Sequence, residues 1–182
     1  MPDQFKTSAI RRAFVEAVSV FMLQKLSCWQ GNLFRMDCHK ATAADARFLF
    51  ELRNLDSNRI QFRNPDKVEW ESHEPWVARF LKNERNRMYV FSVNNEKIGM
   101  FRVDESGDVS VSLLDEFKGK GYGSEMIKIG SSFYLKDFPE AKLFAEIKKE
   151  NAASSKAFMK AGYKLTESLN SDYILLDYAG EK

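Results

Sequence analysis

The sequence is poor in cysteine and proline and has no long apolar run. Its 182 residues include two cysteines, Cys28 and Cys38, and only 4 prolines and 9 glycines. Two cysteines exclude a disulfide framework and a cysteine-rich zinc cluster, and they indicate a reducing compartment such as the cytoplasm. So few prolines and glycines exclude a collagen-like or low-complexity chain.

An excess of charge of one sign is missing as well. The chain has 28 Lys and Arg against 26 Asp and Glu, a net charge of +2. This balance gives no support to nucleic acid as the main partner. A composition of 44% hydrophobic and 30% charged residues excludes a disordered chain. The length suits one domain, which can bury roughly 70% of its unfolded surface.

Residues 1–35 differ from the rest, because five basic and two acidic residues give them a net charge of +3. Apolar residues at helical spacing within Thr7–Trp29 predict an N-terminal helical extension, followed by a domain over residues 36–182. The most apolar part, Ala17–Leu23, is far shorter than the ~20 residues of a membrane span. Three interpretations stay open: a helix packed on the domain, an interfacial membrane helix over residues 7–29, or an upstream extension with Met36 as the true start.

From Asp37 onward the pattern alternates between strands and helices and predicts an α/β (α+β) fold with a mixed sheet. Turn residues at 94–96 and 105–107 predict that three consecutive strands form an antiparallel meander. Ser72 is the expected cap of a helix that tolerates Pro75 in its first turn. The predicted strands are 37–42, 88–93, 98–103, 108–113, 142–147 and 172–178, and the predicted helices are 43–55, 72–81, 121–135 and 152–161.

A glycine-rich turn lies between a predicted strand and a predicted helix. It consists of Lys118, Gly119, Lys120, Gly121, Tyr122, Gly123 and Ser124. Glycines let the backbone approach a ligand, and successive N–H groups at a helix N-terminus bind anions. The spacing fits neither the dinucleotide fingerprint nor the nucleotide P-loop. A phosphate cradle and a merely tight turn are both compatible with this segment alone.

A second motif follows at a suitable distance: Glu146 on a strand, then Asn151 with Ser154, then Phe158-Met159-Lys160-Ala161-Gly162-Tyr163. Together the two motifs resemble the acetyl-CoA-binding core of the GNAT acyltransferase superfamily, over roughly Asp37 to the C-terminus. Lys118 departs from the Arg or Gln usual at that position. The resemblance implies a mostly antiparallel sheet, flanked by helices and splayed where acetyl-CoA binds. It also implies an enzyme that transfers acetyl directly to a primary amine and needs no metal.

The resemblance assigns roles to individual residues. The loop amides of residues 118–124 would hold the coenzyme pyrophosphate, and the backbone around Leu113 and Leu114 would pair with the pantetheine arm and supply an oxyanion donor. Asn151 would contact that arm, although it also suits a helix N-cap. Phe158 would pack along it. Many relatives have Tyr at the position of Phe158, so the phenol that protonates the leaving thiolate is missing here.

Two residues are candidates for the base that takes a proton from the amine. Glu146 lies on the strand that borders the gap, where the branch acetylating ribosomal-protein N-termini has its presumed base. His73 lies in the first helical turn, where the positive end of the helix dipole favours neutral imidazole. A rim carboxylate and a solvated or capping histidine are the alternatives.

The acceptor side contains Arg53, Trp70, His73 and Arg102, an arrangement similar to the branch that acts on amino-sugar nucleotides in pseudaminic acid synthesis. Arginine can clamp phosphates and aromatic rings can stack on a base or sugar, so we expect these four residues to bind a nucleotide sugar. Alternatively, the tryptophans belong to the core and the arginines to a solvated rim. Acetylation of protein N-termini, an acyl-CoA sensor without activity, and a homodimer also stay open.

Overall fold

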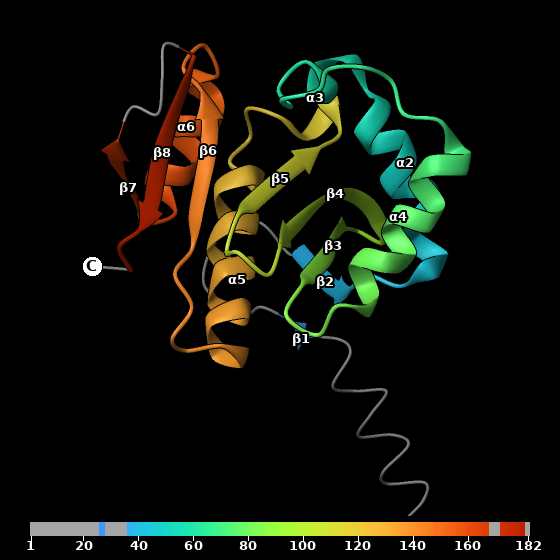
Figure 1. The fold of residues 1–182 in the computed structure, drawn as a ribbon, viewed down its shortest axis with the longest axis horizontal. Coiled ribbons are helices and arrows are strands. Elements are labelled where there is room, and N and C mark those ends of the chain that lie inside the picture. The colour runs from blue at the N-terminus through green and yellow to red at the C-terminus, as the bar shows by residue number, and fades with distance from the viewer. Residues whose placement is uncertain (1–25, 28–35, 168–171, 181–182) are drawn as a thin grey trace, which may run out of the picture.

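The computed structural model describes residues 26–27, 36–167 and 172–180. Within them the strands form two sheets that lie side by side (Figure 1). The larger sheet is antiparallel and has the order β1-β2-β3-β4-β5, and the smaller has the order β6-β8-β7. The strands are β1 Leu26–Ser27, β2 Met36–Lys40, β3 Arg87–Val93, β4 Glu96–Val103, β5 Val109–Leu113, β6 Phe144–Lys148, β7 Tyr163–Glu167 and β8 Tyr173–Tyr178.

Helices cover both faces of the larger sheet. One face carries α2 and α4, and the other carries α5, which lies between the two sheets and packs against α6 as well (Figure 1). The α-helices are α2 Ala46–Asn54, α3 Asp56–Arg59, α4 Trp70–Lys82, α5 Tyr122–Asp137 and α6 Ala152–Lys160, and η1 Ala43–Asp45 and η2 Asp115–Phe117 are short 3-10 turns.

Successive side chains of β3 are buried on opposite faces of the larger sheet. Met88 and Val90 are buried among the residues of α2 and α4, whereas Tyr89 and Phe91 are buried in the cluster that includes α5. Because successive side chains of a strand point to opposite faces, an apolar run of this kind is typical of a strand covered on both sides. Burial of both faces fixes the register of the central strands.

Helix α5 approaches the sheet unusually closely at Gly130. A Cβ atom at that position would lie 2.3 Å from Cδ1 of Phe101 on β4. This close approach holds the middle of the helix against the sheet.

The predicted fold class is confirmed, including the antiparallel meander of β3, β4 and β5. Asn94 and Asn95 join β3 to β4 with φ values of 52° and 66°, as expected for a tight hairpin. Helix α4 begins at Trp70 rather than at Ser72, whose hydroxyl donates a hydrogen bond to the Glu69 carbonyl inside the first turn. The predicted cap at Ser72 is therefore wrong.

Strand β7 was not predicted, because Lys164, Leu165 and Thr166 are all exposed and give no buried alternation. In the N-terminal stretch, Leu26 and Ser27 pair with β2 as a strand and do not continue the predicted helix. The rest of that helix lies outside the described residues, and the division into residues 1–35 and 36–182 stays a prediction.

Candidate active site

The two sheets meet at the start of β5 and then separate. Asp108 and Phe144 form an isolated parallel bridge, in which the Phe144 N–H donates to the Gly107 carbonyl at 3.0 Å. Past this bridge β5 and β6 belong to different sheets, and no further ladder joins them among the described residues (Figure 1). The strands therefore diverge from a vertex at Asp108 and leave one edge of β5 unpaired.

The register shows which backbone groups of β5 face this gap. The Leu114 N–H donates to Ile98 O at 2.9 Å, so Gly99 and Leu113 form a non-hydrogen-bonded pair. Leu113 consequently turns its N–H and carbonyl toward the open edge. Its carbonyl already accepts a 3.0 Å hydrogen bond from Asn58 Nδ2, which leaves the N–H facing the gap. Leu113 thus has a backbone N–H at the open edge, and its contact with the coenzyme and its role as oxyanion donor stay predictions.

Leu114 does not share this role. Its N–H is bonded to Ile98, and its carbonyl accepts a hydrogen bond from Phe117 N–H at 3.1 Å. Both backbone groups are therefore engaged inside the protein, contrary to the expectation that Leu114 pairs with the pantetheine arm.

The glycine-rich turn is built as a cradle at the mouth of the gap. Gly119 and Gly121 have φ values of 73° and 93°, which side chains disfavour, and no side chain caps α5. The amides of Gly123 and Ser124 have no carbonyl partner within the helix, because they belong to its first turn. They lie at the positive end of a 16-residue helix, so the turn fits the diphosphate of a coenzyme.

The side chains of this turn mostly support the loop. Lys118 Nζ lies 2.7 Å from both Asp115 Oδ1 and Ser57 Oγ and ties the loop to α3. The Ser124 hydroxyl donates to Gly121 O at 2.8 Å. Tyr122 is buried with its ring edge-on to Phe117, whereas Lys120 is exposed. Contacts between these side chains and a coenzyme stay predictions.

Asn151 and Phe158 lie on the far side of the gap. Asn151 is the N-cap of α6, and its side-chain oxygen accepts a hydrogen bond from Ser154 N–H at 3.0 Å. Phe158 is 2% exposed and packs edge-on against Tyr163. The Tyr163 hydroxyl, in turn, lies 2.8 Å from Ser131 Oγ. The structure therefore assigns a capping role to Asn151 and a core position to Phe158, and their contacts with the coenzyme stay predictions.

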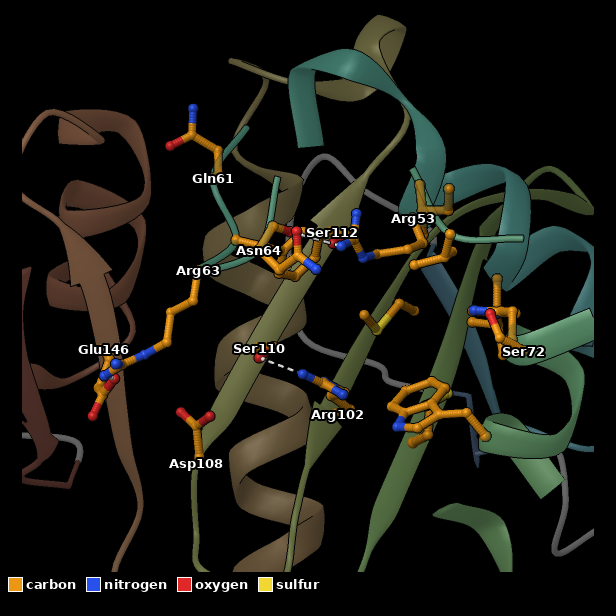
Figure 2. Close-up of a pocket in the computed structure, with 18 of the residues that line it drawn as sticks. Arg53, Gln61, Arg63, Asn64, Ser72, Arg102, Asp108, Ser110, Ser112 and Glu146 are labelled. Carbon is orange, nitrogen blue, oxygen red and sulfur yellow. Dashed lines mark hydrogen bonds and ion pairs between the residues drawn. The ribbon is translucent and has the colours of Figure 1, made fainter. Parts of the chain in front are cut away.

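Beside the vertex lies a pocket of about 560 Å³, bounded by α2, α4, β4, β5, β6 and β8 (Figure 2). It brings together Arg53, His73, Arg102 and Glu146, four of the residues predicted from the sequence. Trp70 does not line it, because its indole packs edge-on against Phe50. For Trp70 the structure favours the core alternative. The other polar residues of the lining are Gln61, Arg63, Asn64, Ser72, Arg79, Asp108, Ser110, Ser112 and Tyr173.

Polar atoms without partners are concentrated in this pocket. Four buried side-chain nitrogen or oxygen atoms lack a hydrogen-bond partner in the described part of the chain, and three of them belong to the lining residues Arg53, Gln61 and His73. Such atoms are costly to bury and are usually satisfied by a ligand or water. Arg53 uses Nη2 to donate to Asn64 O at 2.8 Å, while Nη1 is the unpartnered atom.

Two features of its surroundings lower the pKa of His73 and favour the neutral imidazole. Burial lowers the pKa of His73, and the charge of Arg53 lowers it further. The side chain packs between Phe50 and Trp76, and its unpartnered Nε2 can form one hydrogen bond with a ligand.

Arg102 carries a largely buried charge that no carboxylate neutralises by direct contact. Its guanidinium lies 5.3 Å from the ring centre of Trp76 and 3.5 Å from Ser110 Oγ. Burial lowers its pKa, and the more distant Asp108 and Asp104 partly counter this effect. Among residues 36–167 and 172–180 it makes no ion pair, which is unusual for a guanidinium that the protein partly buries.

The carboxylates of the pocket differ from one another. Glu146 forms an ion pair with Arg63, whose guanidinium also lies over the ring of Tyr173. Asp108, at the vertex, was missed by sequence reasoning. Burial and the charge of Asp104 raise the pKa of Asp108 to about 6, against opposing contributions from Arg102 and Arg63. The available signal was its strand parity with Ser110 and Ser112, because alternate residues of a strand share one face and all three line the pocket.

An internal strand edge, an anion cradle at its end and a polar pocket at its start define a coenzyme A-dependent acyltransferase. Residues 35–164 match the family model described as acetyltransferase (GNAT) domain, and the chain belongs to this family. It is therefore an acetyltransferase, and enzymes of this family use acetyl-CoA. No curated protein matches the sequence significantly.

Solved structures share the fold at low sequence identity. A domain from Methanocaldococcus jannaschii DSM 2661 has a TM-score of 0.69 and 19% identity, over 80% of this chain and 98% of that one. Spermidine N-acetyltransferase from Vibrio cholerae, in complex with CoA and spermine, has a TM-score of 0.68 and 15% identity, over 78% and 94% of the two chains. A dodecameric structure of the Vibrio enzyme has a TM-score of 0.63 and 16% identity, over 78% and 92%.

Two kinds of structural feature are absent from the described residues. None of their helices has the length and apolar character needed to cross a membrane. No group of three or more His, Cys, Asp or Glu side chains among them is arranged to hold a metal ion.

Proposed function

We propose that this enzyme transfers the acetyl group of acetyl-CoA to the primary amine of a small, negatively charged acceptor, an amino-sugar nucleotide. The observation that carries the proposal is the charge of the pocket. Four arginines and two carboxylates line it, and one of those carboxylates is already paired with an arginine. Arg53, Arg79 and Arg102 make no ion pair with any residue that the structure describes.

The geometry suits a diphosphate on the acceptor. Arg53 lies on α2 and Arg102 on β4, and both line the pocket. Burial disfavours their charges, and an anion bound between them would compensate for that cost. Burial is the main reason that the pKa of Arg53 is lowered, and repulsion by the charge of Arg102 lowers it further. His73 Nε2 adds a neutral group that can bind a sugar or base.

The same charges argue against the other acceptors. A polyamine such as the spermidine of the Vibrio enzyme would bring positive charge to arginines that already repel each other. A basic peptide would need an acidic groove. Glu69, Glu71 and Glu74 are exposed on or beside α4, and none of them lines the pocket. Acetylation of protein N-termini therefore ranks behind acetylation of an amino-sugar nucleotide.

The proposed reaction uses the groups described above. Bound acetyl-CoA supplies an activated acyl group and a thiolate leaving group. The amides of Gly119–Ser124 would hold its pyrophosphate, and the Leu113 N–H would donate to the developing oxyanion. Glu146 and His73, the base candidates, both lie in the pocket. Glu146 would orient the acceptor together with Arg63, and His73 would bind it, because its lowered pKa keeps the imidazole neutral near pH 7.

The test is coenzyme A release from acetyl-CoA with four amines: a UDP-linked aminodideoxy sugar, the same sugar without its nucleotide, spermidine, and the N-terminal peptide of a ribosomal protein. A blank without acceptor corrects for thiols of the protein. One charge-assisted hydrogen bond contributes about 1.5–3 kcal/mol, so we expect kcat/KM to be about 10- to 100-fold higher for the nucleotide-linked sugar than for the free one. Faster turnover of spermidine or the peptide would contradict the proposal. Coenzyme binding without turnover would support the sensor alternative.

A further inference from the structure

Asp108 has the position expected of a group that acts on the reacting amine. It lies at the bridge where β5 and β6 meet, and its side chain lines the acceptor pocket. Glu146, two residues beyond the bridge partner Phe144, lies on the opposite strand. Figure 2 shows the Asp108 carboxylate between the Arg63–Glu146 pair on one side and Arg102 on the other.

The carboxylate of Asp108 is uncommitted, in contrast to that of Glu146. It makes no hydrogen bond or ion pair with another side chain of the described residues, whereas Glu146 is held by Arg63. The backbone N–H of Asp108 donates to Asp104 Oδ1 at 3.2 Å, which fixes the residue at the start of β5 without using its carboxylate. A carboxylate that lines a pocket without a partner is free to accept a proton from a ligand.

The charged groups around Asp108 are nearly balanced. The two positive groups are Arg102 on β4 and Arg63 before α4, and the two negative groups are Asp104 after β4 and Glu146 on β6. The phenol of Tyr163 on β7 is also near, since the charge of Asp108 is one cause of its raised pKa. Burial and Asp104 together outweigh the two arginines, so the pKa of Asp108 rises to about 6. The residue is then ionised near neutral pH and still basic enough to accept a proton.

We infer that Asp108 is the base that takes the proton from the acceptor amine, directly or through one water. This inference rests on the proposed acetyl transfer to an amine and adds to it the residue that deprotonates the acceptor. The ammonium group loses one proton to the Asp108 carboxylate, and its nitrogen then attacks the thioester carbonyl. The C–N bond forms first and gives a tetrahedral oxyanion, to which the Leu113 N–H donates. When this intermediate collapses, the C–S bond breaks and its electron pair goes to the departing thiolate, which takes the second amine proton and leaves as coenzyme A while the amide forms. The proton passes from Asp108 to solvent after the product leaves.

The experiment compares the wild type with Asp108→Asn and Glu146→Gln, using the UDP-linked aminodideoxy sugar as acceptor and measuring kcat/KM from pH 5 to pH 9. We expect the wild-type profile to bend downward below about pH 6. Asp108→Asn should lower kcat by about 10²- to 10⁴-fold, remove that bend and leave the Kd of acetyl-CoA unchanged. Glu146→Gln should keep the bend.

Asp104→Asn is the matched control variant. If Asp108 had only a structural role, this substitution would not change the pH at which kcat/KM bends. Its amide oxygen can still accept the bonds from Ser106 and from the Asp108 N–H, so the turn is preserved, while the charge that raises the Asp108 pKa is lost. The bend should therefore move to lower pH. This variant also tests the inference if Asp108→Asn does not fold.

The possible outcomes distinguish the proposed function from the role of Asp108. A wild type that acetylates none of the four amines overturns the proposed function, and the role of Asp108 falls with it. An active wild type whose kcat and pH bend survive in Asp108→Asn overturns the role of Asp108 alone. So does a bend that disappears in Glu146→Gln, or one that stays in place in Asp104→Asn.

Discussion

Arg102→Met should weaken acceptor binding and stabilise the fold at the same time. Methionine keeps an unbranched apolar chain that can pack against Trp76 and Phe80, so little packing is lost. The substitution removes a buried charge that lacks an ion pair within the described residues, and the free energy of unfolding should rise by about 1 kcal/mol. For a protein of this size that corresponds to an increase in Tm of about 2–4 °C.

Acceptor binding should change in the opposite direction. Loss of one charge-assisted hydrogen bond to a phosphate costs about 1.5–3 kcal/mol, so KM for the UDP-linked sugar should rise about 10- to 100-fold. The KM for acetyl-CoA should stay the same, because Arg102 lies on the pocket side of β4, away from the glycine-rich turn.

The assays are thermal unfolding and steady-state kinetics with each substrate varied in turn. Arg85→Met is the control, because Arg85 lies over the ring of Phe138 and is not part of the pocket lining. A large loss of stability in Arg102→Met, with an unchanged KM for the acceptor, would refute the reasoning that this arginine is kept for a ligand.

Three further substitutions test other parts of the structure. Gly121→Glu should abolish acetyl-CoA binding, measured by calorimetry, because it adds a carboxylate and a strained φ of 93° to the anion cradle; full affinity would contradict the assignment of the cradle. Gly130→Ala should lower the free energy of unfolding by about 1–3 kcal/mol, since its Cβ would lie 2.3 Å from Phe101, and an unchanged urea midpoint would exclude this close approach. Burial raises the pKa of Asp45, but bonds from Lys97, Thr42 and His39 outweigh it and hold the pKa below 3.8, so its stabilisation is complete above pH 3.8 and is lost as the pH falls further. In Asp45→Asn this part of the acid-induced loss of stability should be missing from urea titrations at several pH values.

The fold could be predicted because its signals are local. The meander follows from alternating strands and asparagine turns, and the coenzyme side follows from a glycine pattern at a strand-to-helix junction. Strand β7 could not be predicted, because its exposed residues carry no periodic signal. Its position depends on hydrogen bonds to β8, which are formed only in the tertiary structure.

The acceptor pocket was only partly predictable, because its chemistry depends on contacts between distant segments. The Arg63–Glu146 pair joins residues 83 positions apart and holds the carboxylate of one candidate base in an ion pair. The raised pKa of Asp108 comes from burial and from Asp104 across a turn. No sequence pattern reports how deeply a strand end is buried, so the same aspartate was predicted only as the first residue of a strand.

The unpaired edge of β5 also bears on how this protein avoids self-association. An open strand edge is a template for a strand from another molecule, and proteins usually protect such edges at their periphery. Here the edge lies inside the molecule, beside β6, and Asn58 from α3 occupies the Leu113 carbonyl. Because β6 lies next to this edge, the edge is not offered at the periphery to a strand from another molecule. The separation of two sheets around one strand edge thus leaves that edge open without placing it where another molecule can add a strand.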